Sequence, residues 1–275
     1  MSDIYADGRD NKAQLHIGLI LPDVLGTYGD DGNALVLRQR ARLRGLTAEI
    51  VPIKLGQAVP ESLDLYTVGG GEDTAQILAA EHLIADGGIA RAVNAGRPVL
   101  AICAGLQVFG QSFRASDRMV DGLGLIDATT SALEKRMIGE IASTPLADPH
   151  HPVTSQLSEP LTGFANHMGA TILGKDATPL GRLTKGTGNS DEHAARGVGL
   201  GSHEVEPQIK AEGAVQGSVV ATYMHGPALA RNPQLADALL AAAMGITISE
   251  LPAVESGFGV QLDREVAKLR RERLG

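Results

Sequence analysis

The sequence predicts an α/β protein built on an open, mostly parallel sheet that is flanked by helices and carries antiparallel additions. Three observations indicate this fold class. Short apolar runs alternate with amphipathic segments of helical length in the first hundred residues, as in βαβ units. These runs are continuous, which is typical of parallel strands buried on both faces. From about residue 123 strand-like segments dominate, and they would extend the sheet in the antiparallel sense or form a small second layer.

The expected elements follow from these runs and from the turn residues between them. In the first half we expect strands at 16–21, 48–53, 65–68 and 98–102, a helix at 34–43, and a helical stretch at 74–94 that is interrupted at Gly87-Gly88. In the second half we expect strands at 123–127, 137–141, 164–167 and 218–225, a mobile loop at 184–201, and helices at 233–244 and 262–274.

The chain length of 275 residues suits one large domain with embellishments. We expect a flexible tail at 1–14, the main domain at 15–248, and an extension at 249–275 that contains a charged helix. The N-terminus lacks the apolar core of a signal peptide, and no apolar run is long enough to span a bilayer. A cytoplasmic protein without membrane insertion is therefore expected.

The composition excludes several classes of function. The net charge of −8 disfavours binding to a phosphate backbone, and an aromatic content of 3% disfavours a stacking surface for single-stranded nucleic acid. One cysteine excludes both an internal disulfide and a zinc site built from cysteines. We therefore expect a partner or substrate other than nucleic acid.

The single cysteine, Cys103, follows the apolar run at 98–102 and precedes a short helical pattern. The thiol is thus predicted at a sharp turn between a buried strand and a helix, which is how nucleophile elbows are built. Ala101 and Gly105, two positions to either side, are small enough for such a crowded turn. A lone cysteine is also commonly a small buried hydrophobe, and that structural alternative stays open at this point.

A thiol becomes a strong nucleophile when a base or a positive dipole stabilises its thiolate. Of the 8 histidines, His225 is the best candidate for the base, because it ends an apolar strand and precedes a Gly-Pro turn. His167, which follows Asn166 in a short strand between glycines, is a secondary candidate. No metal site is predicted, since the adjacent His150 and His151 have no acidic or cysteine companion at a useful spacing.

Acyl chemistry through a thiolate also needs N–H donors for an oxyanion. The turn Gly69-Gly70-Gly71 closes the strand at 65–68, which in this topology neighbours the strand leading to Cys103. It is a candidate for those donors, with an ordinary connecting turn as the alternative. The loop at 25–33 also joins a strand to a helix, but it lacks a phosphate-binding glycine pattern and contains two adjacent aspartates, so nucleotide binding there is not expected.

Five motifs together resemble those of class I glutamine amidotransferases of the cobyric-acid-synthase type. In chain order they are Tyr28-Gly29-Asp30-Asp31-Gly32-Asn33, Gly69-Gly70-Gly71-Glu72-Asp73-Thr74-Ala75-Gln76, Cys103-Ala104-Gly105-Leu106-Gln107, Gly163-Phe164-Ala165-Asn166-His167 and Tyr223-Met224-His225-Gly226. The resemblance covers about residues 16–245 and implies a flavodoxin-like fold. The first motif and the segment Lys135-Arg136-Met137-Ile138-Gly139 narrow it to the glutaminase subunits of lipid II isoglutaminyl synthase.

The resemblance implies that Cys103 attacks the side-chain amide of glutamine, giving a γ-glutamyl thioester and ammonia, with His225 as the base. It implies an oxyanion hole made by backbone N–H groups at Gly70 and Ala104. The guanidinium of Arg136 could pair with a carboxylate of glutamine. The substrate-binding residues that it implies are Arg136, Gln107, Asn166 and His167.

One position departs from the wider class I pattern. Many members carry a glutamate two residues after the histidine to orient it, whereas this chain has Pro227 there. The partner of His225 is therefore open. The enzyme works either as a dyad or with another group, such as the turn at Asn166-His167.

The resemblance further implies a heterodimer with a MurT-like, Mur-ligase-type synthetase subunit. That partner would use ammonia to amidate the α-carboxyl of the D-glutamate of lipid II in peptidoglycan synthesis. ATP and Mg²⁺ are expected on the partner, and no cofactor is expected in this chain. Three rival functions remain. They are a glutaminase that serves another synthetase of the cobyrinate type, a non-catalytic binding module on the same fold, and a cysteine hydrolase that acts on esters or peptides.

Overall fold

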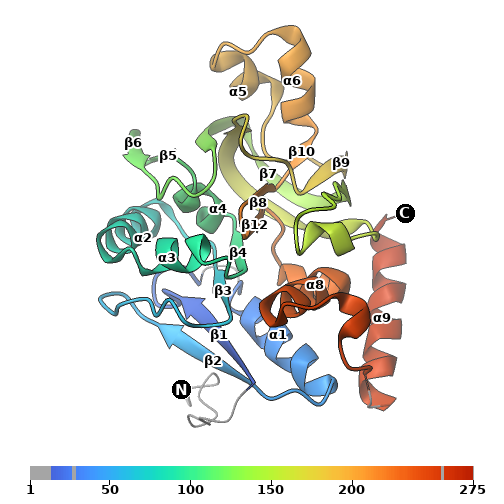
Figure 1. The fold of residues 1–275 in the computed structure, drawn as a ribbon. Helices are drawn as coiled ribbons and strands as arrows, with labels where there is room; N and C mark the ends of the chain where they lie inside the picture. The colour runs from blue at the N-terminus through green and yellow to red at the C-terminus, as the bar shows by residue number, and fades with distance from the viewer. Residues whose placement is uncertain (1–13, 27–28, 255–256, 275) are drawn as a thin grey trace.

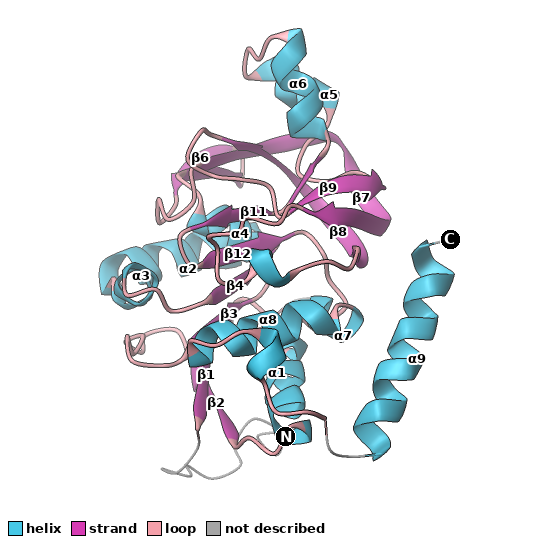
Figure 2. Cartoon of the chain, turned by 45° about the vertical axis from the view of Figure 1, so that its right-hand side comes forward, coloured by secondary structure: helices cyan, strands magenta, loops and turns pink. Residues whose placement is uncertain are grey.

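The computed structural model describes residues 14–26, 29–254 and 257–274. Within these ranges the chain forms two six-stranded sheets (Figures 1 and 2). The first has the order β11 (Ala214–Gln216), β12 (Val219–Thr222), β4 (Val99–Ile102), β3 (Leu65–Val68), β1 (Leu15–Ile20) and β2 (Ala48–Ile53). Only β11 is antiparallel to its neighbour in this sheet as described, so the predicted parallel sheet is confirmed.

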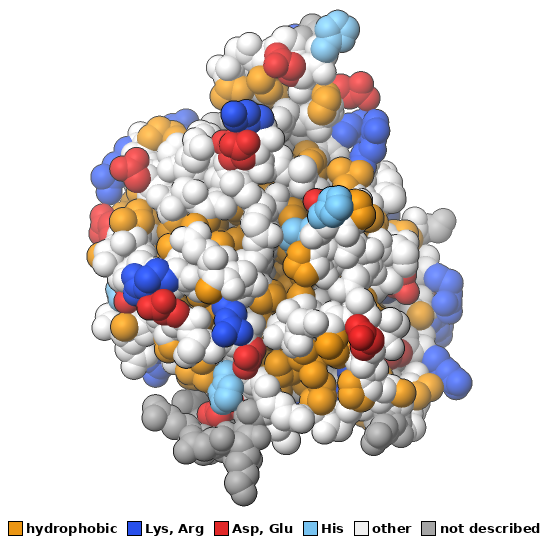
Figure 3. Space-filling model, in the orientation of Figure 1, with side chains coloured by type: hydrophobic (Ala, Val, Ile, Leu, Met, Phe, Trp, Pro, Cys, Tyr) orange, Lys and Arg blue, Asp and Glu red, His pale blue; other side chains and the backbone are white. Residues whose placement is uncertain are grey.

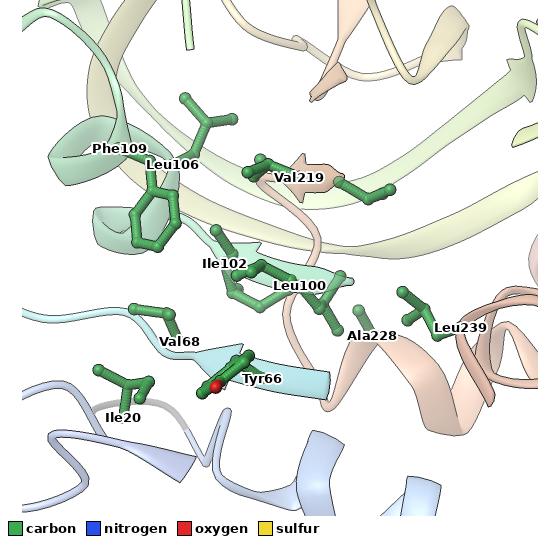
Figure 4. Packing of buried hydrophobic residues seen from close by; sticks show 14 of the residues in the cluster. Ile20, Tyr66, Val68, Leu100, Ile102, Leu106, Phe109, Val219, Ala228 and Leu239 are labelled. Atoms are coloured by element: carbon green, nitrogen blue, oxygen red, sulfur yellow. The ribbon is translucent and has the colours of Figure 1, made fainter. Parts of the chain in front are cut away.

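Helices cover both faces of the first sheet. α1 (Gly32–Leu43), α7 (Ala228–Arg231) and α8 (Pro233–Met244) contact one another on one side, whereas α2 (Asp73–Asp86), α3 (Gly88–Asn94) and α4 (Ala104–Phe109) lie on the other (Figure 1). The predicted interruption at Gly87 is confirmed, because this residue ends α2 in the left-handed region with φ of 68°. Buried side chains from the central strands pack against both helical layers and form the core (Figure 4).

The second sheet contains the predicted antiparallel additions. Its order is β10 (Ala211–Glu212), β9 (Gly181–Lys185), β7 (Ala128–Pro145), β5 (Ser112–Ala115) and β6 (Arg118–Asp121), and β8 (Leu161–Leu173) pairs with β7. The predicted strands at 137–141 and 164–167 lie inside β7 and β8, which are far longer. The pairing of these two strands shifts register between Ala132 and Met137.

Three expectations for the second half were wrong. The segment 123–127 is irregular, because the N–H groups of Leu123, Leu125 and Ile126 donate to carbonyls at the end of α4. The expected mobile loop at 184–201 contains α5 (Glu192–Gly197), whose N-terminus is capped by the Asp191 carboxylate. The strand expected at 218–225 ends at Thr222.

The remaining elements lie at the periphery. α6 (Ser202–Ile209) and α5 project at the end of the molecule opposite β1 and β2, and α9 (Gly257–Leu274) runs along one side (Figures 1 and 2). α9 confirms and lengthens the predicted C-terminal helix. The division at residue 248 stays a prediction, and residues 1–13 of the expected tail and Tyr28 of the first motif lie outside the described residues.

The surface in Figure 3 has acidic and basic side chains side by side and no broad patch of one sign on that face. Among the described residues, no helix is both long and apolar enough to cross a bilayer.

Candidate active site

Cys103 occupies a strained elbow between β4 and α4. Its φ of 53° is positive, which is uncommon for a residue with a side chain and typical of a nucleophile elbow. Gly105 is required beside it, since a Cβ there would lie 3.1 Å from the carbonyl oxygen of Val68. The Cys103 N–H donates to the Thr222 carbonyl at 2.9 Å, which ties the elbow to the end of β12. The predicted strand–turn–helix geometry is therefore confirmed.

His225 lies three residues beyond the end of β12. Its backbone is fixed by an isolated bridge to Phe164 on β8, with the His225 N–H donating to the Phe164 carbonyl at 2.9 Å. The imidazole is buried, with 3% of the residue exposed, and interacts electrostatically with Cys103. The structure thus brings the predicted nucleophile and base together.

Asp30 is the partner of His225 that sequence reasoning missed. The Nδ1–H of His225 donates to the Asp30 carboxylate, at 2.9 Å from Oδ2 and 3.0 Å from Oδ1. Asp30 is itself buried, in the turn that leads into α1, where the Asn33 side chain donates to its carbonyl at 2.9 Å. The acid therefore comes from the loop after β1 and not from the position of Pro227.

The two neighbours of His225 determine its charge. Burial by itself lowers the pKa of His225, but the hydrogen bond to Asp30 and the interaction with Cys103 outweigh burial and raise the pKa to about 10. The imidazole is therefore protonated at neutral pH. A cation at this position favours the thiolate form of a neighbouring cysteine, which is the reactive form.

Gly70 lies where the three side chains meet. A Cβ at this position would approach Asp30 Oδ2 to 3.0 Å, His225 Cε1 to 3.2 Å and Cys103 Cβ to 3.5 Å, so the close assembly depends on glycine. The Gly70 N–H donates to Asp30 Oδ2 at 3.0 Å. This hydrogen bond differs from the prediction, which gave the same N–H to an oxyanion. Ala104, the other predicted donor, is the first residue of α4 and is buried.

A cavity of about 390 Å³ opens beside the thiol. Five residues predicted for the site line it, namely Cys103, Gln107, Arg136, Asn166 and His167. Gly71 and Glu72 from the turn after β3, and Asp73 at the start of α2, form another part of the wall. The cavity therefore joins the nucleophile to the residues expected to bind substrate.

Arg136 and Asn166 form the exposed part of this wall. They lie on the paired strands β7 and β8, and the Arg136 Nε–H donates to Asn166 Oδ1 at 2.9 Å. The hydrogen bond orients the guanidinium beside the cavity, where it could pair with a carboxylate.

His167 and Gln107 lie deeper and share a neighbour, Tyr223, which sequence reasoning also missed. The rings of His167 and Tyr223 stack with their centroids 3.8 Å apart. Gln107 Nε2 donates to the Tyr223 hydroxyl at 3.2 Å, and this hydroxyl also pairs with Thr171 Oγ1 at 2.7 Å. A signal was present in the sequence, because Tyr223 stands two residues before His225 in the same motif.

Similarity to known proteins agrees with this geometry. Residues 16–233 match the family of CobB/CobQ-like glutamine amidotransferase domains. The lipid II isoglutaminyl synthase (glutamine-hydrolyzing) subunit GatD of Staphylococcus aureus is 31% identical over 82% of this chain and 83% of its own length. The GatD subunit of Streptococcus pneumoniae is 30% identical over 94% of this chain and 92% of its own length.

Two further comparisons concern a longer relative and the fold. A cobyric acid synthase from Photorhabdus laumondii is 29% identical over 80% of this chain but only 39% of its own length. A crystal structure of a glutamine amidotransferase is 19% identical with a TM-score of 0.51, and the match covers 83% of this chain and 98% of that one. The structural match confirms the predicted fold.

Proposed function

The chain belongs to the CobB/CobQ-like glutamine amidotransferase family, and from this premise we propose that it is the glutamine-hydrolysing subunit of a lipid II isoglutaminyl synthase. The observation that carries the proposal is the length of the similarity. The chain matches both GatD subunits over more than four fifths of their length, whereas it matches only 39% of the cobyric acid synthase.

In the proposed first step, the Cys103 thiolate attacks the carboxamide carbon of glutamine and forms a carbon–sulfur bond. The protonated His225 gives its proton to the nitrogen, the carbon–nitrogen bond breaks, and ammonia leaves behind a γ-glutamyl thioester. The raised pKa of His225 and its interaction with Cys103 support this role as the acid. Asp30 keeps the imidazole oriented throughout.

In the second step, neutral His225 accepts a proton from water, whose oxygen attacks the thioester carbon. The carbon–sulfur bond breaks, glutamate leaves, and the thiolate and imidazolium are restored. Both tetrahedral intermediates need donors for the oxyanion. Because the Gly70 N–H is engaged by Asp30, we assign this role to the N–H of Ala104 together with that of Gly71, whose residue lines the cavity.

The released ammonia would pass to a MurT-like, Mur-ligase-type subunit that binds ATP and Mg²⁺ and amidates the D-glutamate α-carboxyl of lipid II. A glutaminase for a cobyrinate-type synthetase is the alternative that the 29% identical relative supports. A non-catalytic module is disfavoured, because it would have no use for a strained, buried thiol beside a buried ion pair.

The test combines this chain with a Mur-ligase-like synthetase from the same organism and measures ammonia release and lipid II amidation. We expect glutamine-dependent amidation, and Cys103→Ala and His225→Ala should each abolish ammonia release without unfolding the chain. A glutamine-mimicking diazo-ketone should add to Cys103 and shift the intact mass. The absence of that adduct would contradict the glutaminase, whereas ammonia release with amidation of a cobyrinate instead of lipid II would favour the alternative.

A further inference from the structure

His167 carries a buried hydrogen-bond acceptor that no described residue satisfies. Its Nδ1 lies 2.9 Å from the Gly169 carbonyl oxygen, and because a carbonyl can only accept, Nδ1 must carry the hydrogen. Nε2 is then a bare acceptor in a residue that is only 2% exposed. Among the described residues Nε2 has no hydrogen-bond partner.

The surroundings of His167 keep this acceptor unprotonated. Burial is the main cause that lowers the pKa of His167 to about 4, and the neighbouring cations His225 and Arg136 lower it further against the hydrogen bond to Gly169. At neutral pH the ring is therefore neutral. A buried acceptor without a donor destabilises the unliganded site, so a ligand that brings an N–H or O–H to this point would bind more tightly because of it.

The position of His167 in the cavity limits which atom of a ligand can donate a hydrogen bond to Nε2. It lines the same cavity as Cys103, and its ring stacks on Tyr223, whose hydroxyl accepts a hydrogen bond at 3.2 Å from Gln107, one turn along α4 from Cys103. Arg136 and Asn166 are more exposed and lie toward the solvent side of the wall. His167 is thus on the inner, thiol side of the cavity.

Glutamine offers two N–H groups, the α-ammonium and the carboxamide. With the carboxamide carbon at Cys103 and the α-carboxylate toward Arg136, the carboxamide nitrogen is the donor on the inner side. We propose that His167 Nε2 accepts a hydrogen bond from the carboxamide NH₂ of glutamine and makes the site select glutamine over glutamate. This inference rests on the proposed glutaminase function and assigns its specificity.

The physical basis is the asymmetry between an amide and a carboxylate. Glutamate has only acceptor oxygens at the same position. In its complex, the lone pairs of a carboxylate oxygen would point at the lone pair of His167 Nε2, and the two atoms would repel each other. A site built to pair with a substrate N–H rejects an analogue that lacks it, because the buried partner is left unpaired. Because the product glutamate cannot form this hydrogen bond, it would also leave the site more readily.

The test measures binding without turnover, in a Cys103→Ala parent, by calorimetry with three ligands. These are L-glutamine, L-glutamate, and the γ-methyl ester of glutamate, which is neutral at the γ position but has no N–H there. Adding His167→Phe keeps an aromatic ring for the stack and removes the acceptor. We expect it to weaken glutamine about tenfold or more and to change the ester less than threefold.

Two controls separate this contact from other effects. His167→Gln, which keeps an acceptor oxygen, should recover part of the glutamine affinity. His82→Phe, at a half-buried histidine on α2 that does not line the cavity, should leave all three affinities unchanged. Equal losses for glutamine and the ester, or no loss for either, would overturn the role of His167. If the Cys103→Ala parent binds no glutamine at all, the proposed function fails instead.

Discussion

Asp30 and His225 are 195 positions apart in the chain and meet in a buried hydrogen bond of 2.9 Å. Asp30 follows β1 and His225 follows β12, with β3 and β4 between those strands in the sheet. The carboxylate reaches across because the turn after β3 is made of glycines, and a Cβ on Gly69 would lie only 2.2 Å from the Leu25 carbonyl oxygen. The orientation of the base thus depends on how the first loop packs over the glycine turn.

Asp30→Asn should lower kcat by on the order of 10³-fold, because an amide can neither hold the imidazole in the same tautomer nor stabilise its cation. The KM for glutamine should change little, since Asp30 does not line the cavity. Asp31→Asn is the matched control in the same loop, where the Asp31 carboxylate lies beside Gly26. Steady-state ammonia release checks both variants, and equal activities would contradict the role of Asp30.

The free energy of unfolding should depend on the protonation of His225 at alkaline pH. The folded pKa of His225, about 10, lies above the ordinary value of 6.5, so the protonated form favours the folded state. Its contribution is complete below pH 6.5 and falls as the pH rises toward 10. Denaturant unfolding of the wild type and of His225→Gln should therefore converge over this interval, by on the order of a few kcal/mol.

A Cys103→Ala background provides the check on this pH effect. The interaction with Cys103 is one of the causes of the raised pKa of His225, so the fall between pH 6.5 and 10 should shrink when the thiol is removed. A stability difference that stays constant over this interval would show that His225 is not charged in the folded protein.

Gly70→Ala should separate the nucleophile from its base. The new methyl group would come within 3.2 Å of His225 Cε1 and 3.5 Å of Cys103 Cβ, and the side chains must move by a few tenths of an ångström. A displacement of about 1 Å in an active site costs about 10²-fold in kcat. We therefore expect this smaller displacement to lower kcat by about tenfold or more. Gly197→Ala, where a Cβ meets open space, should leave ammonia release unchanged.

The parallel sheet and the Cys103–His225 pair could be predicted from the sequence because their signals are local. Continuous apolar runs mark the buried strands, and a small-residue pattern marks the elbow around Cys103. Asp30 could not be assigned in this way. Its function depends on a contact with His225 across the sheet. In the sequence, the adjacent pair Asp30-Asp31 indicated only that the loop does not bind a nucleotide.

The second sheet was harder to predict, because its strands are partly exposed. β7 contains the run Glu134-Lys135-Arg136, whose exposed side chains hide the strand, so only 137–141 was recognised. The opposite error occurred at 123–127, where an apolar run resembles a strand but its N–H groups close the end of α4. In α5, the buried Ala194 packs in a small cluster with Leu133, a contact that the polar composition of the segment concealed.

Arg40 joins three helices through carboxylates that lie far apart in the sequence. Its guanidinium, on α1, donates to both Asp237 oxygens on α8, at 2.7 and 2.8 Å, and to Asp263 on α9 at 2.8 Å. Arg40→Ala should destabilise the fold by about 3–5 kcal/mol, because within the described part of the chain the buried Asp237 would keep only Arg44 as a cationic partner. Arg91→Ala removes an exposed pair with Glu61 and should cost at most about 1 kcal/mol.

The double variant Arg40→Met/Asp237→Leu distinguishes two effects of Arg40, namely its pairing with the buried Asp237 and its hydrogen bond to Asp263 on α9. It removes both members of the Arg40–Asp237 pair but leaves the Arg44 guanidinium without its carboxylate, so denaturant unfolding should show only part of the stability restored. It does not restore the bond to Asp263, and proteases should therefore still cut the segment before α9 faster than in the wild type. If Arg40→Ala unfolds at the same denaturant concentration as Arg91→Ala, the pair does not stabilise the fold, and equal cutting rates in all variants would show that Arg40 does not hold α9.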